Sequence, residues 1–137
     1  MVLDTNVVID WLLFDDPSSC SLAAAIARRH VKWIATAAMR DELADVMQRG
    51  LATKCGVDPV AALACWDRLV EQLGEPAPLL TELALRCSDP DDQKFVNLAL
   101  GEGAHWLLSR DHAVLKLQRP AAVHGLTISL PGDWRLP

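Results

Sequence analysis

The amino-acid sequence predicts a single domain of the α/β class, in which a mainly parallel sheet is covered by helices on both faces. Short apolar runs alternate along the chain with longer segments of helical periodicity, a pattern typical of strand–helix–strand units. The length of 137 residues matches one domain. A hydrophobic content of 51% is enough for a substantial core and argues against disorder.

The first half of the chain is expected to contain two strands and four helices. Apolar runs predict strands at residues 2–3 and 32–36. Apolar residues at helical spacing predict helices at residues 5 to about 14, 17–29, 37 to about 49, and 58–74. Pro17 suits the start of the second helix, and Gly50 either ends or bends the third.

The second half is expected to contain two more strands and two helices. Ser88, Asp89 and Pro90 are typical of a helix start, and that helix should run to about residue 100. The remaining predicted elements are a strand at 104–109, a short helix at 111–117 and a last strand at 123–130. Residues 79–87 fit either a strand or a helix. Residues 130–137 are expected to form an irregular tail, and nothing divides residues 1–137 into further domains.

Composition limits the functions that the chain could have. A net charge of −5 argues against a protein that coats nucleic acid through a broad basic face. It is compatible with a nuclease, because a cluster of carboxylates can be neutralised locally by divalent metal. No apolar run approaches the roughly 20 residues of a membrane span. The sequence does not contain the basic segment followed by an apolar run that is typical of a secretion signal, so secretion is not predicted.

The four cysteines are scattered and form no C-x-x-C pair, which argues against a zinc site or thioredoxin-like chemistry. They fit free thiols in a reducing cytosol, so a cytoplasmic protein is expected.

Two carboxylates follow directly after predicted strands. Asp4 comes after the first apolar run, and Asp111 follows the strand that ends near Ser109. In open α/β sheets, ligands bind at the carboxyl ends of the strands. A buried carboxylate there needs a partner or a metal, because its desolvation is very costly. Each of these residues could instead be a helix N-cap.

Two further carboxylates lie on predicted helices. Glu42 flanks the apolar stripe of its helix, although it could equally be a surface residue that reaches solvent. Asp92 shares a helix face with Phe95 and Val96, although it could instead complement the helix dipole. Asp10, Asp15 and Asp16 are expected only on a helix surface and in a turn.

A metal would explain why four carboxylates converge. Carboxylates packed together repel one another unless cations lie between them. Mg²⁺ and Mn²⁺ prefer hard oxygen ligands, and such ions can activate a water for phosphodiester hydrolysis. None of the four histidines has the spacing of a metal ligand or a catalytic triad.

Four segments, in this order, resemble a PIN domain. They are Val-Leu-Asp4-Thr-Asn, Arg-Asp-Glu42-Leu, Asp89-Pro-Asp-Asp92-Gln-Lys-Phe95 and Trp-Leu-Leu-Ser109-Arg-Asp111. The resemblance extends from residue 2 to about residue 117 and is strongest to the branch that contains toxins of bacterial toxin–antitoxin systems. It implies a three-layer α/β/α sandwich with a central, mainly parallel sheet of about five strands. It also implies an endoribonuclease that hydrolyses single-stranded RNA with Mg²⁺ or Mn²⁺.

The resemblance assigns roles to particular residues. The catalytic and metal-binding positions of the family correspond to Asp4, Glu42, Asp92 and Asp111. Positions that support the carboxylates or waters correspond to Thr5, Asn6 and Ser109. Basic residues expected to form a small rim that contacts RNA are Arg40, Lys94 and Arg110. A small antitoxin protein is the implied partner. A homodimer is also implied, through the apolar helices between residues 18 and 66, although those faces could equally be core.

Two departures from the family pattern keep a second hypothesis open. The first strand begins at Met1 with almost no preceding residues, and the position two residues after Asp111, often acidic in the family, is Ala113. A weakened metal site would leave a catalytically weak or inactive PIN-like module that acts by binding protein or RNA. A phosphatase or nucleotide-binding protein is disfavoured, because the glycine-rich phosphate loops are absent from the sequence.

Overall fold

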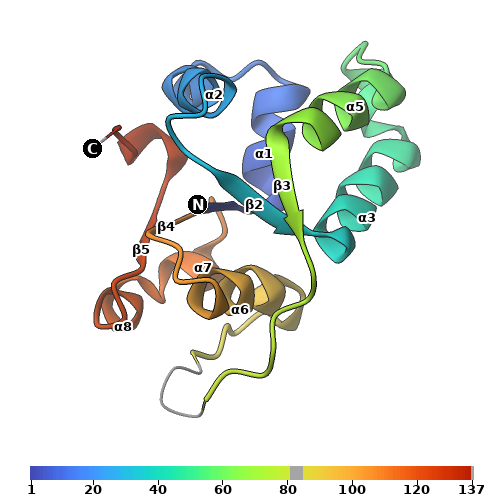
Figure 1. Ribbon diagram of the computed structural model, residues 1–137. Coiled ribbons are helices and arrows are strands. Elements are labelled where there is room, and N and C mark those ends of the chain that lie inside the picture. Colours follow the sequence, from blue (N-terminus) through green and yellow to red (C-terminus); the bar gives the residue numbers. More distant parts are fainter. Residues whose placement is uncertain (81–84, 137) are drawn as a thin grey trace.

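Five short parallel strands form the centre of the molecule (Figure 1). In this computed structural model, which describes residues 1–80 and 85–136, the strands are β1 (Val2–Leu3), β2 (Trp33–Thr36), β3 (Val70–Leu73), β4 (Trp106–Leu108) and β5 (Thr127–Ser129). Hydrogen bonding divides them into a three-stranded sheet, β1-β4-β5, and a two-stranded sheet, β2-β3. The two sheets meet where the Met1 carbonyl accepts a hydrogen bond from the Ile34 amide at 3.0 Å. The prediction of a mainly parallel arrangement is confirmed.

Helices cover the strands on both sides and complete the three layers (Figure 1). The helices α1, α2, α3 and α5 lie on one side, and α6, α7 and α8 lie on the other. The helices are α1 (Thr5–Leu12), α2 (Cys20–Ala27), α3 (Ala37–Val46), α4 (Ala52–Lys54), α5 (Pro59–Leu69), α6 (Gln93–Gly101), α7 (His112–Leu115) and α8 (Gln118–Ala122). None of them, within the described part of the chain, is both long and apolar enough to cross a membrane.

The core holds the strands in place because the strands are too short to be stable through backbone hydrogen bonds alone. Val2 and Leu3 of β1 are buried, as are Leu107 and Leu108 of β4. Three indole rings also pack together in the core, with Trp33 of β2 between the other two. The Trp33 ring lies 5.5 Å from that of Trp11 and 5.9 Å from that of Trp66, measured between centroids. Burial of this apolar surface is the main driving force for folding.

Local sequence signals place several helix starts where they were expected. The Asp58 side chain accepts a hydrogen bond from the Val60 amide at 3.0 Å, and Pro59 occupies the first turn of α5. The Asp89 side chain accepts from the Asp91 amide at 2.9 Å, in the 3₁₀ turn Pro90–Asp92 that precedes α6. These caps fix the direction in which the chain enters α5 and α6, and α6 carries the candidate residue Lys94.

Two expected elements have different bounds in the structure, and an unexpected element lies beside each. The helix that begins after residue 58 ends at Leu69 rather than at residue 74, because Val70–Leu73 pair with β2 as the strand β3. The expected last strand starts at Thr127 rather than at 123, and residues 118–122 form the helix α8 instead of a connection. In both places tertiary pairing or packing overrides a local pattern that fitted more than one element.

The remaining differences concern the connections. Gly50 has a positive φ of 98° within the π-helical turn Met47–Leu51, so it bends the chain between α3 and α4. Of the ambiguous segment 79–87, residues 79, 80 and 85–87 form neither strand nor helix, and residues 81–84 lie outside the described part. The tail is more ordered than expected, since it contains a 3₁₀ turn at Pro131–Asp133 and a fully buried Trp134.

Candidate active site

Asp4 lies at the carboxyl end of β1 and is 3% exposed. Its Oδ2 atom accepts hydrogen bonds from Asn6 Nδ2, at 2.9 Å, and from the hydroxyl of Ser109. Asp4 and Ser109 meet because the residues before them, Leu3 and Leu108, pair with each other in the sheet. Burial raises the pKa of Asp4, and the hydrogen bonds from Ser109 and Asn6 oppose that rise.

Asp111 follows β4 and is joined to Asp4 through one hydroxyl group. The Asp111 amide donates to Ser109 Oγ at 2.9 Å, and the same hydroxyl donates to Asp4. One carboxylate oxygen of Asp111 also caps α7, since Oδ1 accepts from the Ala113 amide at 2.6 Å. The N-cap role considered for Asp111 is therefore present together with its position beside Asp4.

Asp92 enters the same region from the opposite layer, at the start of α6. Its Oδ2 atom is buried and has no hydrogen-bond partner. Burial raises the pKa of Asp92 to about 7, and the negative charges of Asp4, Asp111 and Asp89 contribute to that rise. A buried carboxylate oxygen without a partner is rare in folded proteins because desolvating it is costly.

Glu42 and Lys94 form an ion pair between α3 and α6. Their side chains are 33% and 25% exposed, so the pair is more accessible than Asp4. Glu42 also belongs to the electrostatic environment of Asp4, since its charge contributes to the raised pKa of Asp4. The four predicted carboxylates thus influence one another, although they come from four separate parts of the chain.

These residues form what we call the acidic cluster: Asp4, Glu42, Asp92 and Asp111. Hard carboxylate oxygens suit Mg²⁺ or Mn²⁺, and the unpartnered Asp92 oxygen is the atom that such an ion would satisfy most directly. Within residues 1–80 and 85–136, no group of three His, Cys, Asp or Glu side chains stands ready to hold an ion. Asp4, Glu42 and Asp111 have protein partners, and binding of an ion by these carboxylates would require some of those contacts to be exchanged.

The predicted supporting residues occupy the first turn of α1 and the end of β4. Asn6 links two parts of the site, because its amide group donates to Asp4 while its Oδ1 accepts from the Arg110 amide at 3.2 Å. Thr5 is buried beside them. Ser109 is fully buried and holds both Asp4 and Asp111 through its hydroxyl.

Each of the three predicted basic residues forms an ion pair with a carboxylate from another part of the chain. Arg40 makes a two-pronged ion pair with Asp67 of α5, at 2.6 and 2.8 Å. The Arg110 guanidinium pairs with Asp10 and Asp16. Lys94 is paired with a member of the acidic cluster.

Asp10 and Asp16 were expected only on a helix surface and in a turn. They hold the side chain of Arg110, whose backbone amide in turn binds Asn6. The contact between Arg110 and Asp16 joins residues 94 apart in the sequence, so no local pattern could have indicated it.

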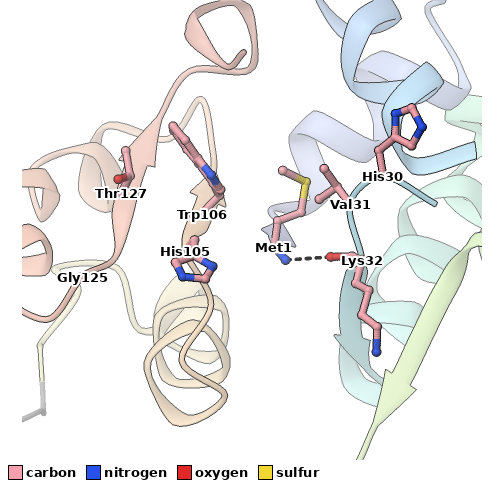
Figure 2. Close-up of a pocket in the computed structure, with 8 residues that line it drawn as sticks. All are labelled: Met1, His30, Val31, Lys32, His105, Trp106, Gly125 and Thr127. Carbon is pink, nitrogen blue, oxygen red and sulfur yellow. Dashed lines mark hydrogen bonds between the residues drawn. The ribbon is translucent and has the colours of Figure 1, made fainter. Parts of the chain in front are cut away.

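A separate cavity of about 600 Å³ lies at the opposite end of the strands. Figure 2 shows its two walls: residues that begin β4 and β5 on one side, and Met1 with the segment that leads into β2 on the other. Its lining residues are Met1, His30, Val31, Lys32, His105, Trp106, Gly125 and Thr127. None of them is acidic, so this cavity and the acidic cluster are chemically and spatially distinct.

Comparison with known proteins gives one match. A family model described as PIN domain matches residues 1–113, which is most of the chain and includes the whole acidic cluster. Neither the curated proteins nor the solved structures give a match.

Proposed function

Since the chain belongs to the PIN-domain family, whose members are generally metal-dependent nucleases, we propose that it is a Mg²⁺- or Mn²⁺-dependent endoribonuclease. The proposed substrate is single-stranded RNA, and the reaction is hydrolysis of a phosphodiester bond. Asp4, Glu42, Asp92 and Asp111 are the proposed metal-binding and catalytic residues.

The unpartnered oxygen of Asp92 is the observation that carries this proposal. A carboxylate that is partly buried beside two others raises the free energy of the folded protein unless a proton or a cation neutralises it. The raised pKa of Asp92 means that, without metal, this carboxylate binds a proton more tightly than an ordinary aspartate does. A divalent cation would do the same at neutral pH while leaving the carboxylates ionised.

Each residue has a proposed task. A bound divalent ion would polarise the attacking water and stabilise charge on the leaving oxygen. Asp4 and Asp92 would hold the ion from opposite layers of the fold, with Glu42 and Asp111 completing an all-oxygen site. Ser109 and Asn6 fix the orientation of Asp4, as groups around metal ligands generally do.

Lys94 is the basic residue best placed to contact an RNA phosphate near the cluster. Arg40 and Arg110 are proposed to act at the edge of the site, where a phosphate would have to compete with Asp67 or with Asp10 and Asp16. The net charge of −5 implies that binding relies on these few cations and on metal rather than on a broad basic face.

We further propose that the protein is the toxin of a toxin–antitoxin pair, restrained by a small antitoxin protein in the cytoplasm. The order of its four motif segments supports the toxin assignment, and four free cysteines fit a reducing compartment. A homodimer would have to use surfaces other than the apolar faces of α2 and α3, because those faces lie in the core. Co-purification with the product of an adjacent small reading frame would test the partner.

The direct test is cleavage of a labelled single-stranded RNA by the full chain in Mn²⁺ or Mg²⁺, with EDTA as the metal-free arm. Asp92→Asn should abolish metal-dependent cleavage. Asp91→Asn is the matched control, because Asp91 is the exposed neighbour of Asp92 and should leave cleavage unchanged. If wild type cuts no faster than Asp92→Asn in either metal, the nuclease proposal fails.

A second candidate function is a PIN-like module that binds RNA or protein without cleaving. The observation in its favour is that no three side chains of the described residues stand ready to hold an ion. RNA binding without metal-dependent cleavage in the same assay would support this alternative.

A further inference from the structure

The strongest unassigned feature is the position of Lys94 within the acidic cluster. Its ammonium group contacts the Glu42 carboxylate and the backbone carbonyl of Asp91, and it lies 4.9 Å from the centre of the Phe95 ring. The side chain is only 25% exposed. Three partners hold one long side chain at a defined place, which is more than an ordinary surface ion pair provides.

Among the described residues, Lys94 supplies positive charge to the acidic cluster. Its charge lowers the pKa of Asp92, and its ion pair engages Glu42. The neighbouring basic residues Arg40 and Arg110 are held by carboxylates outside the cluster. One positive charge therefore faces four carboxylates.

We propose that the Lys94 ammonium is a built-in counter-cation that a divalent ion displaces from Glu42. This inference rests on the proposed metal-dependent function and adds an order of events to it. Displacement follows from electrostatics, because an ammonium group and a divalent ion on the same carboxylate repel each other at close range.

The displaced Lys94 ammonium group is placed to contact an RNA phosphate. Because Lys94 lies in the first turn of α6, its side chain stays at the edge of the cluster when it leaves Glu42. A free ammonium beside a metal-loaded site attracts a phosphate oxygen of an RNA chain. Metal loading thus creates the phosphate contact, and by thermodynamic reciprocity RNA binding strengthens metal binding.

The test is a Mn²⁺ titration of the full-length protein, followed by calorimetry, in wild type and Lys94→Met. The variant should bind Mn²⁺ about fivefold or more tightly, because the competing charge is gone. Lys94→Arg keeps that charge and should bind Mn²⁺ like wild type. Lys32→Met is the matched control, because it removes the ion pair of a lysine with Glu71 outside the cluster, and its Mn²⁺ affinity should not change.

Thermal unfolding gives a second readout. Without metal, Lys94→Met should unfold at a lower temperature than wild type, because its carboxylates lose their counter-charge. Saturating Mn²⁺ should close that gap, since an ion that binds only the folded state stabilises it. If Lys94→Met does not fold, Lys94→Gln takes its place, because it keeps a polar group that can still contact the Asp91 carbonyl.

Kinetics separate this role from a merely structural one. Lys94→Met should raise KM for RNA more than it lowers kcat, and Lys94→Arg should restore KM. If wild type binds Mn²⁺ and Lys94→Met binds it equally or more weakly, the inference is overturned while the nuclease proposal stands. If wild type binds neither Mn²⁺ nor Mg²⁺, the proposed function itself fails.

Discussion

The two ends of the same five strands are built in opposite ways. At the carboxyl end, Asp4 and Ser109 are buried, hydrogen-bonded and contributed by segments far apart in the sequence. At the amino end, a cavity of about 600 Å³ is lined by exposed side chains such as His30 and His105. The lysine at that end, Lys32, pairs with Glu71 at 3.0 Å. The carboxyl end thus brings buried carboxylates together, whereas the side chains that line the amino end are mostly exposed and include no acidic residue.

The two ends also differ in their titratable groups. At the amino end, the Met1 amino group lines the cavity, and burial lowers its pKa. At the carboxyl end, burial and neighbouring negative charges raise the pKa of Asp92 to about 7, and its buried Oδ2 has no hydrogen-bond partner. Several interacting carboxylates with perturbed pKa values indicate a functional site more strongly than one perturbed group alone.

The largest expected effect is on cleavage when Asp4 is changed. Asp4→Asn keeps the shape of the side chain but removes a ligand charge, so metal-dependent RNA cleavage should fall by about a hundredfold or more. The measurement is kcat/KM in Mn²⁺ at fixed ionic strength. Asp133→Asn, an exposed carboxylate in the tail, is the control. Cleavage by Asp4→Asn at the wild-type rate would contradict the assignment of chemistry to the carboxyl end.

A smaller effect is expected on stability when the hydroxyl that joins two carboxylates is removed. Ser109→Ala leaves Asp4 without one donor and the Asp111 amide without its acceptor, so unfolding free energy should fall by about 1–3 kcal/mol. Urea denaturation measures this. Ser129→Ala is the matched control. Ser129 pairs with Leu108 on the next strand, and its buried hydroxyl has no hydrogen-bond partner to lose. Equal losses in the two variants would show that the hydrogen bonds of Ser109 contribute nothing.

The pH dependence of stability gives a third comparison. The pKa of Asp92 is raised from 3.8 to about 7, so the folded protein binds this proton more tightly than the unfolded chain does. Without metal, the contribution of Asp92 to stability is therefore lost as the pH rises from the pKa of Asp92 in the unfolded chain toward 7. Asp92→Asn should be more stable than wild type by about 1 kcal/mol at neutral pH, a value reduced for partial solvent screening.

That difference should vanish in acid, where Asp92 is protonated in both the folded and the unfolded chain. Urea denaturation in EDTA across this pH range measures it. Asp91→Asn should follow the wild-type pH profile, because Asp91 is exposed. If Asp92→Asn also showed the wild-type dependence of stability on pH, the raised pKa of Asp92 would be contradicted.

The smallest effect is expected at the amino end. His105→Ala removes an exposed side chain of the cavity, so stability should change by about 0.5 kcal/mol or less and RNA cleavage should not change. Both are measured beside Ser109→Ala, which lies at the other end of the same strand. A loss of cleavage in His105→Ala would mean that the two ends are not functionally separate.

The parts of the fold that the sequence predicted well are those with strong local signals. The strand at Trp33, the caps at Asp58 and Asp89, and the parallel arrangement all follow from apolar runs and turn residues. The strand β3 was missed because its pairing with β2 is a tertiary contact, and the sequence Val-Glu-Gln-Leu continues the helical spacing before it. Burial of Trp134 in the tail was missed for the same reason.

The candidate site was predictable in its residues but not in its contacts. Aspartates after strands and at helix starts indicate an edge of a parallel sheet, which is a topological argument. The pairing of Lys94 with Glu42 and the capture of Arg110 by Asp10 and Asp16 depend on how separate helices pack. Such contacts are decided by side-chain geometry between elements, which no spacing rule contains.

The hydrogen bond between Ser109 and Asp4 also has a consequence for protein synthesis. It joins residues 105 apart, so the first carboxylate of the cluster emerges from the ribosome long before its partner is made. The amino-terminal elements can fold first, as domains do during translation, but the cluster cannot assemble until Asp111 has been synthesised. A nascent chain therefore carries no complete site until its Asp111 segment has left the ribosome.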